Sequence, residues 1–247
     1  MNARRHPVFL WAIALLATAL FARLGFWQLE RADEKRDMLG KASSALASRA
    51  PKPLSVIADA ARRTDYDWVE VEGRFADTPA VLLDNQQRGG KVGVRAYRVF
   101  LLKDGPPLLV DLGWSALPPD RTLPRVARDD ERDRLAGLLM PPPGQGLDMG
   151  PPVRQSDDTL LATAIDPPTL RVALNLPALA PRVLRPDNDP TLGFPRDFDI
   201  LPNTLPPERH VGYAVQWFGL SITVLITALL LSWRRRRAAQ RDHRPSQ

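Results

Sequence analysis

The sequence PNTLPPERHVGYAVQW, Pro202–Trp217, together with the apolar residues behind it, decides the fold class of this chain. No residue from Val211 to Trp233 carries a formal charge. These 23 residues, at about 1.5 Å each, span roughly 35 Å, enough to cross a hydrocarbon core of about 30 Å. Pro206-Pro207 disfavours helix upstream, and Arg234–Arg237 follow the apolar run. We therefore predict a transmembrane helix with its lead-in over residues 206–233, with His210 at its boundary.

A second apolar run, Val8–Ala22, lies near the N-terminus. It is interrupted at Arg23, whose aliphatic stem can reach the membrane surface, and Gly25–Trp27 extend it. We predict a first transmembrane helix over residues 7–29. An alternative is a cleaved signal peptide, for which Ala17–Ala19 is a suitable cleavage site. The second helix would anchor the chain in either case.

The basic residues are concentrated at the two ends of the chain. Residues 1–22 carry a net charge of +2 and residues 234–247 carry +5, whereas residues 24–209 carry −2. By the positive-inside rule we expect residues 1–6 and 234–247 to be cytoplasmic and residues 30–205 to be periplasmic. The basic tails then account for the isoelectric point of about 10.1, so this value does not imply a nucleic acid as a partner. Membrane lipid is the more economical partner of the basic tails, although a phosphate backbone is an alternative.

The chain contains no cysteine, so the exported domain must be held together by a hydrophobic core rather than by disulfides. The same absence removes thiolate metal sites. With His210 as the one histidine in the exported part, a metal carrier built from Cys and His ligands is nearly excluded.

Patterns within residues 30–205 predict a mainly antiparallel β domain, barrel-like or a sandwich. A polar helical stalk is expected over Arg23–Leu46, ended by Pro51 and Pro53. Trp68 and Trp114 are expected at the core or its rim. The strands are expected near residues 67–75, 81–83, 95–102, 108–114, 135–140, 160–165 and 182–185, with a short helix over 167–174 and turns over 84–90 and 103–105. We interpret most of Ser115–Asp158 as proline-rich loops.

Both helices carry small residues at helical spacing. Gly212, Gln216, Gly219 and Thr223 form one such series, and Ala14, Thr18, Ala22 and Gly25 form the other. Small residues permit close helix approach, so we expect the two series to pack together, or one of them to face a partner's helices. A hydrogen bond between Gln28 and Gln216 is also expected.

The residue patterns give little support for an enzyme. There is no Gly-x-Ser-x-Gly elbow, and Gly89-Gly90-Lys91 lacks the spacing of a phosphate-binding loop. The acidic pairs Asp129-Asp130 and Asp157-Asp158 lie in hydrophilic loops, where solvated charge is the simpler explanation. We predict no catalytic residues.

Two motifs at the membrane edges resemble the Surfeit locus protein one family of cytochrome c oxidase assembly factors. Leu24–Arg31, LGFWQLER, is similar to the family's L-G-x-W-Q-x-x-R, and His210–Phe218, HVGYAVQWF, is similar to its H-x-G-Y-x-x-Q-W-F. Asp84-Asn85 with the glycines after it, and Val110–Trp114, resemble the family's middle motifs more loosely. Leu112 and Gln86 stand where the family has arginines. Any role that the family gives those two arginines therefore cannot be assigned to this chain.

The resemblance implies a factor that assists delivery or insertion of haem A into subunit I of cytochrome c oxidase, a step of respiratory chain biogenesis, with the histidine of the second helix as a haem ligand. It implies subunit I and haem A synthase as partners. Because only seven residues precede the first apolar run, we expect a bacterial inner membrane rather than an organelle import sequence.

Helix geometry is compatible with that role. His210, Tyr213 and Trp217 share one face of a helix, and an imidazole beside an aromatic wall suits a haem iron as its axial base. We therefore expect these three residues to bind the cofactor. Arg23, Arg31 and Arg209 lie near the same interface and could pair with the haem propionates. The packing residues are expected to be Gly25, Trp27, Gln28, Arg31, Gly212, Gln216 and Gly219.

Other interpretations remain open at this point. Tyr213, Trp27 and Trp217 also fit the aromatic belt found at membrane surfaces, with Trp11 and Trp233 on the opposite side. A membrane chaperone that acts through protein contacts alone, without haem, is the main alternative function. A membrane-bound hydrolase is a third.

Overall fold

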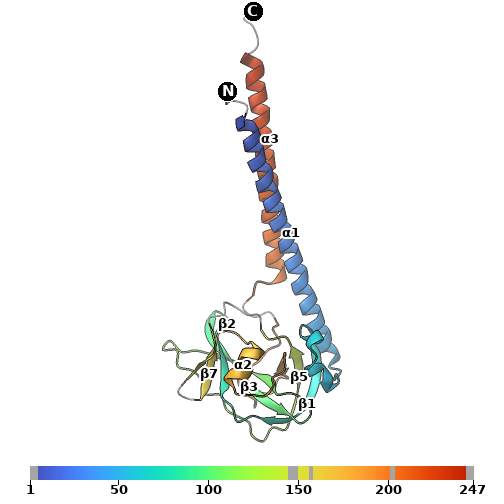
Figure 1. The fold of residues 1–247 in the computed structure, drawn as a ribbon, viewed down its shortest axis with the longest axis vertical. Coiled ribbons are helices and arrows are strands. Elements are labelled where there is room, and N and C mark those ends of the chain that lie inside the picture. The colour runs from blue at the N-terminus through green and yellow to red at the C-terminus, as the bar shows by residue number, and fades with distance from the viewer. Residues whose placement is uncertain (1–4, 144–149, 156–157, 201–203, 243–247) are drawn as a thin grey trace, which may run out of the picture. The chain divides into compact units, whose positions relative to one another are not determined.

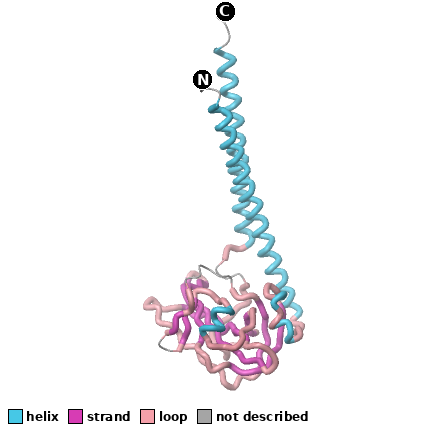
Figure 2. The backbone as a smooth tube through the Cα atoms, in the orientation of Figure 1, coloured by secondary structure: helices cyan, strands magenta, loops and turns pink. Residues whose placement is uncertain are grey.

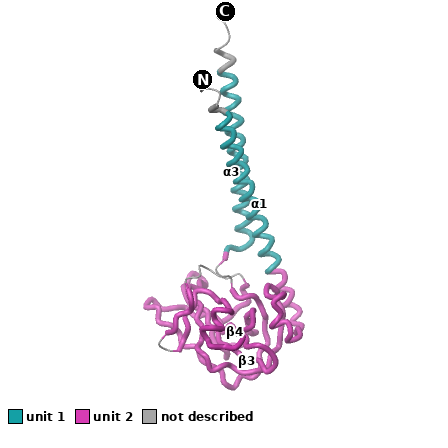
Figure 3. The backbone as a smooth tube through the Cα atoms, viewed as in Figure 1, with its two compact units in different colours: residues 1–38, 205–247 teal, residues 39–204 magenta. Residues whose placement is uncertain are grey.

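The computed structural model describes residues 5–143, 150–155, 158–200 and 204–242. Several residues used in the predictions above, among them Arg4, Asp157, Pro202 and those beyond Asp242, lie outside these ranges. The chain divides into two compact units. One contains residues 1–38 and 205–247, and the other contains residues 39–204 (Figure 3).

Two long helices account for the first unit. Helix α1 is Arg5–Ser48 and helix α3 is Pro207–Asp242 (Figures 1 and 2). Helix α1 ends where Arg49 adopts a φ of 45°, just before Pro51 and Pro53, so the stalk expected over Arg23–Leu46 is helical. Helix α3 begins with Pro207, whose fixed φ suits the first helical position.

Both helices are long and apolar enough to cross a membrane. Their apolar side chains are mostly exposed, as in Leu16 and Val215, with 73% and 66% of their surface accessible. A core helix of a soluble protein would bury these side chains, whereas a lipid environment solvates them. Two candidate membrane-spanning helices of this kind indicate a membrane protein.

The second unit is a sheet domain. Its strands are β1 Asp67–Phe75, β2 Ala80–Arg88, β3 Lys91–Leu102, β4 Leu108–Ala116, β5 Arg134–Met140, β6 Val153–Arg154, β7 Thr159–Ala162 and β8 Val183–Pro186. Its short helices are the 3-10 turns η1 Leu54–Ile57 and η2 Ala60–Arg62, and the α-helix α2 Pro167–Ala173. The Asp166 side chain caps α2 by accepting a hydrogen bond from the amide of Thr169.

The strands form one mixed sheet in the order β1-β5-β8-β4-β3-β2-β7-β6. The pairs β2–β7 and β4–β8 are parallel, and the other pairs are antiparallel. Because β1 also pairs with β3, the five strands β1, β5, β8, β4 and β3 form a closed ring of pairings. A ring of pairings is not by itself a barrel, so the barrel-like form considered from the sequence is not confirmed.

The turn expected over residues 84–90 is mostly strand, which corrects the prediction. Strand β2 continues to Arg88, and the reversal occurs at Gly89 and Gly90, which have positive φ angles of 56° and 75°. The register shifts between Leu83 and Gln86, where Asn85 has a φ of 56°. A β-bulge thus explains why turn-forming residues occur within a strand. Strand β6 was not predicted because its two residues are too few to show a period.

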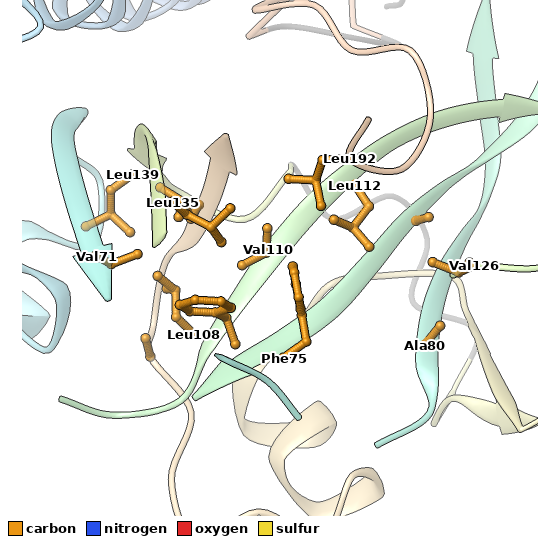
Figure 4. Packing of buried hydrophobic residues seen from close by; sticks show 14 of the residues in the cluster. Val71, Phe75, Ala80, Leu108, Val110, Leu112, Val126, Leu135, Leu139 and Leu192 are labelled. Atoms are coloured by element: carbon orange, nitrogen blue, oxygen red, sulfur yellow. The ribbon is translucent and has the colours of Figure 1, made fainter. Parts of the chain in front are cut away.

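Alternating side chains of the strands build the core (Figure 4). Phe75 and Phe100 meet edge to face with their ring centroids 5.1 Å apart. Trp68 is buried, and the half-buried Trp114 donates its indole N–H to the carbonyl oxygen of Gln86 at 2.9 Å. Leu112 is part of this core, so the position where the family has an arginine is apolar in this chain.

Two ion-pair clusters fix β8 inside the sheet domain. Asp111 accepts hydrogen bonds from Arg95 at 2.8 Å and Arg185 at 2.9 Å, and all three side chains are buried. Asp67 accepts from the buried Arg182 at 2.8 Å and from Arg62 at 2.7 Å. Burial raises the pKa of Asp111, but the facing guanidinium groups outweigh it, so that this pKa lies below its ordinary value of 3.8.

The Asp111 carboxylate is expected to stabilise the folded domain in a pH-dependent way. Because its folded pKa is lower than its unfolded pKa of about 3.9, its contribution is fully present above about pH 4 and is lost as the pH falls through the folded pKa. Asp111→Asn leaves Arg95 and Arg185 without their carboxylate, so we expect a loss of about 3–5 kcal/mol at neutral pH. The variant should also lose part of the acid sensitivity, as measured by chemical unfolding of the detergent-solubilised chain between pH 3 and 7.

The matched control is Asp104→Asn, which removes an exposed carboxylate of the β3–β4 turn. It should leave both the unfolding free energy and its pH dependence unchanged. Equal behaviour of the two variants would contradict the structural role of Asp111.

Gly137 is expected to be irreplaceable for a steric reason. A Cβ atom there would lie 2.2 Å from the carbonyl oxygen of Arg185, which belongs to the neighbouring backbone of β8. We expect Gly137→Ala to destabilise the domain by about 1–3 kcal/mol in thermal unfolding. Gly40→Ala, in α1 with nothing within 4 Å of the added Cβ, should be neutral or stabilising by up to about 1 kcal/mol. The reverse order of stability would show that the close approach of β5 and β8 is not rigid.

Candidate functional site

The candidate site lies on the paired helices α1 and α3 of the first unit. Three hydrogen bonds join them along their length. The indole of Trp11 donates to Ser232 at 2.8 Å, the hydroxyl of Ser221 donates to the carbonyl of Thr18 at 2.9 Å, and His210 bonds Gln28 at 2.7 Å. Because residue numbers fall on one helix as they rise on the other, the helices are antiparallel.

The contacting face of α3 repeats every three or four residues. It contains the buried residues Pro207, His210, Ala214 and Ser221. This is the spacing with which one helix keeps a single face against another. On α1 the corresponding buried residues are Gly25, Ala32 and Lys35. Small residues at the contact let the backbones approach closely.

Aromatic rings fill the contact near Gly25. Phe21 stacks on Trp217 with centroids 5.7 Å apart, and Phe26 meets Phe218 edge to face at 5.2 Å. A Cβ atom at Gly25 would lie 2.7 Å from the ring of Phe218, so this position has room only for glycine unless the ring moves. Gly25 thus lies where the backbone of α1 closely approaches a side chain of α3.

The side chain of His210 is nearly enclosed by its neighbours. Only 7% of its surface is accessible. Its Nδ1 atom is 2.7 Å from Oε1 of Gln28. Its Nε2 atom is buried and has no hydrogen-bond partner. A buried imidazole nitrogen without a partner is rare, because leaving a polar group unsatisfied costs about 1–3 kcal/mol.

Lys35 is a functional candidate that is not among the site residues predicted from the sequence. Its ammonium group is buried and donates to the carbonyl oxygen of Leu205, two residues before α3 begins. This bond ties the start of α3 to α1 close to His210. The signal in the sequence was its spacing, since Gln28 and Lys35 are two helical turns apart and face the same way.

The predicted cofactor-binding residues are only partly brought together. His210 is enclosed and Trp217 packs against Phe21, whereas 37% of Tyr213 is accessible. The arginine Arg31 is exposed and pairs with Glu34 at 2.6 Å on its own helix. Trp27 is also exposed, with half of its surface accessible, as a membrane-surface aromatic residue would be.

The expected packing of the second helix through Gly212 and Gly219 is not found among the residues that the structure describes. Nothing lies within 4 Å of a Cβ atom placed at either glycine, and Gln216 is exposed. Gln28 bonds His210 rather than Gln216, which corrects the hydrogen bond expected from the sequence. The physical reason is that the face containing His210, Ala214 and Ser221 also has small residues, and in addition supplies two polar partners for α1.

Other parts of the described chain offer weaker candidates. No group of three or more His, Cys, Asp or Glu side chains that could hold a metal ion is found among the described residues. A shallow cavity of about 450 Å³ lies beside the start of β3 and the residues after β4, with Lys91, Leu117 and Arg121 in its wall. Its wall has the cations Lys91 and Arg121 but no carboxylate, imidazole or hydroxyl side chain beside them, so His210 remains the strongest candidate.

Comparison with known proteins places these features in a family. The model of the SURF1 family matches residues 15–222, which include both helix motifs and the sheet domain. A SURF1-like protein of Rickettsia felis (strain ATCC VR-1525 / URRWXCal2) is 24% identical over 225 residues, a match that covers 87% of this chain and 92% of the relative. Since the family match extends over most of its length, this chain belongs to the SURF1 family.

Proposed function

We propose that the protein is a non-enzymatic assembly factor for haem-copper cytochrome c oxidase that holds haem A transiently on its way to subunit I. Membership of the SURF1 family, which is generally linked to cytochrome oxidase assembly, supports the general role. One observation carries the finer proposal. It is the buried Nε2 atom of His210, which has no partner while Nδ1 is occupied by Gln28.

The donor set fits an axial ligand of a haem. Haem iron takes an imidazole nitrogen, and His210 has one nitrogen left over after its contact with α1. The stacked rings of Phe21 and Trp217 add an apolar aromatic surface two helical turns along α3. His210 would supply the ligand, Gln28 would hold the imidazole, and these rings would exclude water.

A specific observation also favours a second function, a chaperone that acts through protein contacts alone. Nε2 is covered in this structure, and Trp217 is already committed to Phe21. Ligation of haem would therefore require side chains around His210, at the start of α3, to move. A chaperone without haem would need no such movement, and in that case the exposed small face of Gly212 and Gly219 would contact helices of the partner.

The proposed setting is a bacterial inner membrane with two spans, both termini in the cytoplasm and the sheet domain in the periplasm. The charge of the tails supports this orientation. Subunit I of the oxidase and haem A synthase are the proposed partners, because haem A must be accepted from its source and passed to its final site.

Haem binding is tested by the absorption spectrum of the detergent-solubilised protein purified from cells that make haem A. We expect a haem band in the wild type and its loss in His210→Ala, because the imidazole is the proposed ligand. His243→Ala removes another of the three histidines and should retain the band. A wild type without haem, or a band that survives in His210→Ala, would remove the ligand assignment, and a haem-free wild type would favour the chaperone.

Orientation is tested by thiol labelling, for which the absence of native cysteine leaves a clean background. We expect Asp104→Cys, in the sheet domain, to react with a membrane-impermeant maleimide once the outer membrane is opened. Arg237→Cys, after the second span, should react only when the inner membrane is also disrupted. The opposite pattern would show that the sheet domain is cytoplasmic and would exclude a periplasmic assembly step.

A further inference from the structure

We propose that Gln28 is a positioning residue that fixes the tautomer of His210, with the proton on Nδ1 and the free lone pair on Nε2. This inference rests on the proposed function, because it explains how His210 is prepared to bind a haem iron. It also makes a statement about the protein without haem, which can be tested separately.

The contact between the two side chains defines the tautomer. The Oε1 atom of Gln28 is an amide oxygen, which only accepts hydrogen bonds. At 2.7 Å from Nδ1 it therefore receives the Nδ1–H proton of the imidazole. In a neutral imidazole only one nitrogen carries a proton, so Nε2 is left with its lone pair. This is the nitrogen that the structure leaves buried and unpartnered.

Gln28 is itself held in place by its helix. Gly25, Gln28, Ala32 and Lys35 share one face of α1, and each of them is buried or half-buried. Gly25 lies under the ring of Phe218, and Lys35 bonds the carbonyl oxygen of Leu205. The amide of Gln28 therefore lies between two contacts. One is at Gly25, one helical turn before it, and the other is at Lys35, two turns after it. Such support orients a ligand before the metal arrives.

An amide has a defined electronic effect on the ligand. Metal-ligating histidines usually donate their other N–H to a carboxylate, a carbonyl or water, which fixes the ring and increases its basicity. A neutral amide oxygen gives a weaker effect than a carboxylate would. His210 should therefore behave as a neutral imidazole ligand of moderate strength, which suits a site that must release its cargo.

The direct test is nitrogen-15 NMR of the haem-free, full-length protein in detergent, labelled at its three histidines. His210→Ala assigns the resonances. In the wild type we expect Nδ1 of His210 to show the shift of a protonated ring nitrogen and Nε2 that of an unprotonated one. In Gln28→Leu, which is of similar size and cannot accept a hydrogen bond, the tautomer should become mixed or reverse.

A matched control is Gln216→Leu, which removes the same side-chain type from an exposed position of α3. It should leave the His210 resonances unchanged, and thermal unfolding should confirm that both Leu variants are folded. Protonated Nε2 in the wild type, or an unchanged tautomer in folded Gln28→Leu, would overturn the proposal whether or not haem binds.

Haem titration of the same variants provides the second readout. Gln28→Leu should weaken haem binding by about 10- to 100-fold, while Gln28→Glu should retain it and lower the reduction potential of the bound haem, because a carboxylate increases the basicity of the imidazole. A potential that is identical in the wild type and in Gln28→Glu would overturn the positioning role. If the apoprotein has the expected tautomer but no haem binds, the positioning role stands and the proposed haem function is what fails.

Discussion

Arg182, directly before β8, and Arg185, within it, bring positive charge into the interior of the sheet domain. The arrangement of the neighbouring strands depends on how that charge is neutralised. Each guanidinium has its carboxylate on a different strand, Asp67 on β1 and Asp111 on β4. An unpaired charge in such a place would cost several kcal/mol. The two ion pairs therefore leave β8 only one favourable position, beside β4 and β5. A strand of four residues would be poorly specified by its apolar side chains alone.

In the helix pair of the other unit, too, buried polar groups need partners. Polar side chains at the contact between the two helices find partners on the neighbouring helix, as in the bonds of Ser221 to Thr18 and of Trp11 to Ser232. His210 departs from the rule at one atom, because Gln28 satisfies Nδ1 and nothing described satisfies Nε2. Leaving a buried nitrogen without a hydrogen-bond partner costs stability. This cost is the physical reason to connect the Nε2 atom with function.

Much of the sheet domain could be predicted from the sequence because most strands alternate apolar and polar residues over enough positions to show a period of two. The α2 helix was also predicted, since proline is favoured in the first turn of a helix and Pro167-Pro168 begin it. The end of β2 was not, because Asn85 and the residues around it are typical of turns and only the pairing with β3 makes them a bulged strand. The buried ion pairs were missed for a related reason. Arg95, Asp111 and Arg185 are far apart in the sequence, and charged residues are usually exposed.

For the candidate site, the sequence by itself determined that His210 stands where an apolar helix begins, that Gly25 and Gln28 share a face of the other helix, and that both helices are long enough to cross a membrane. Local composition and helical spacing are sufficient for these properties. Only the tertiary structure decided which face of α3 meets α1, since two faces of that helix contain small residues and spacing does not distinguish them. The face with His210 is the one that packs, because it also gives the polar groups of α1 their hydrogen-bond partners.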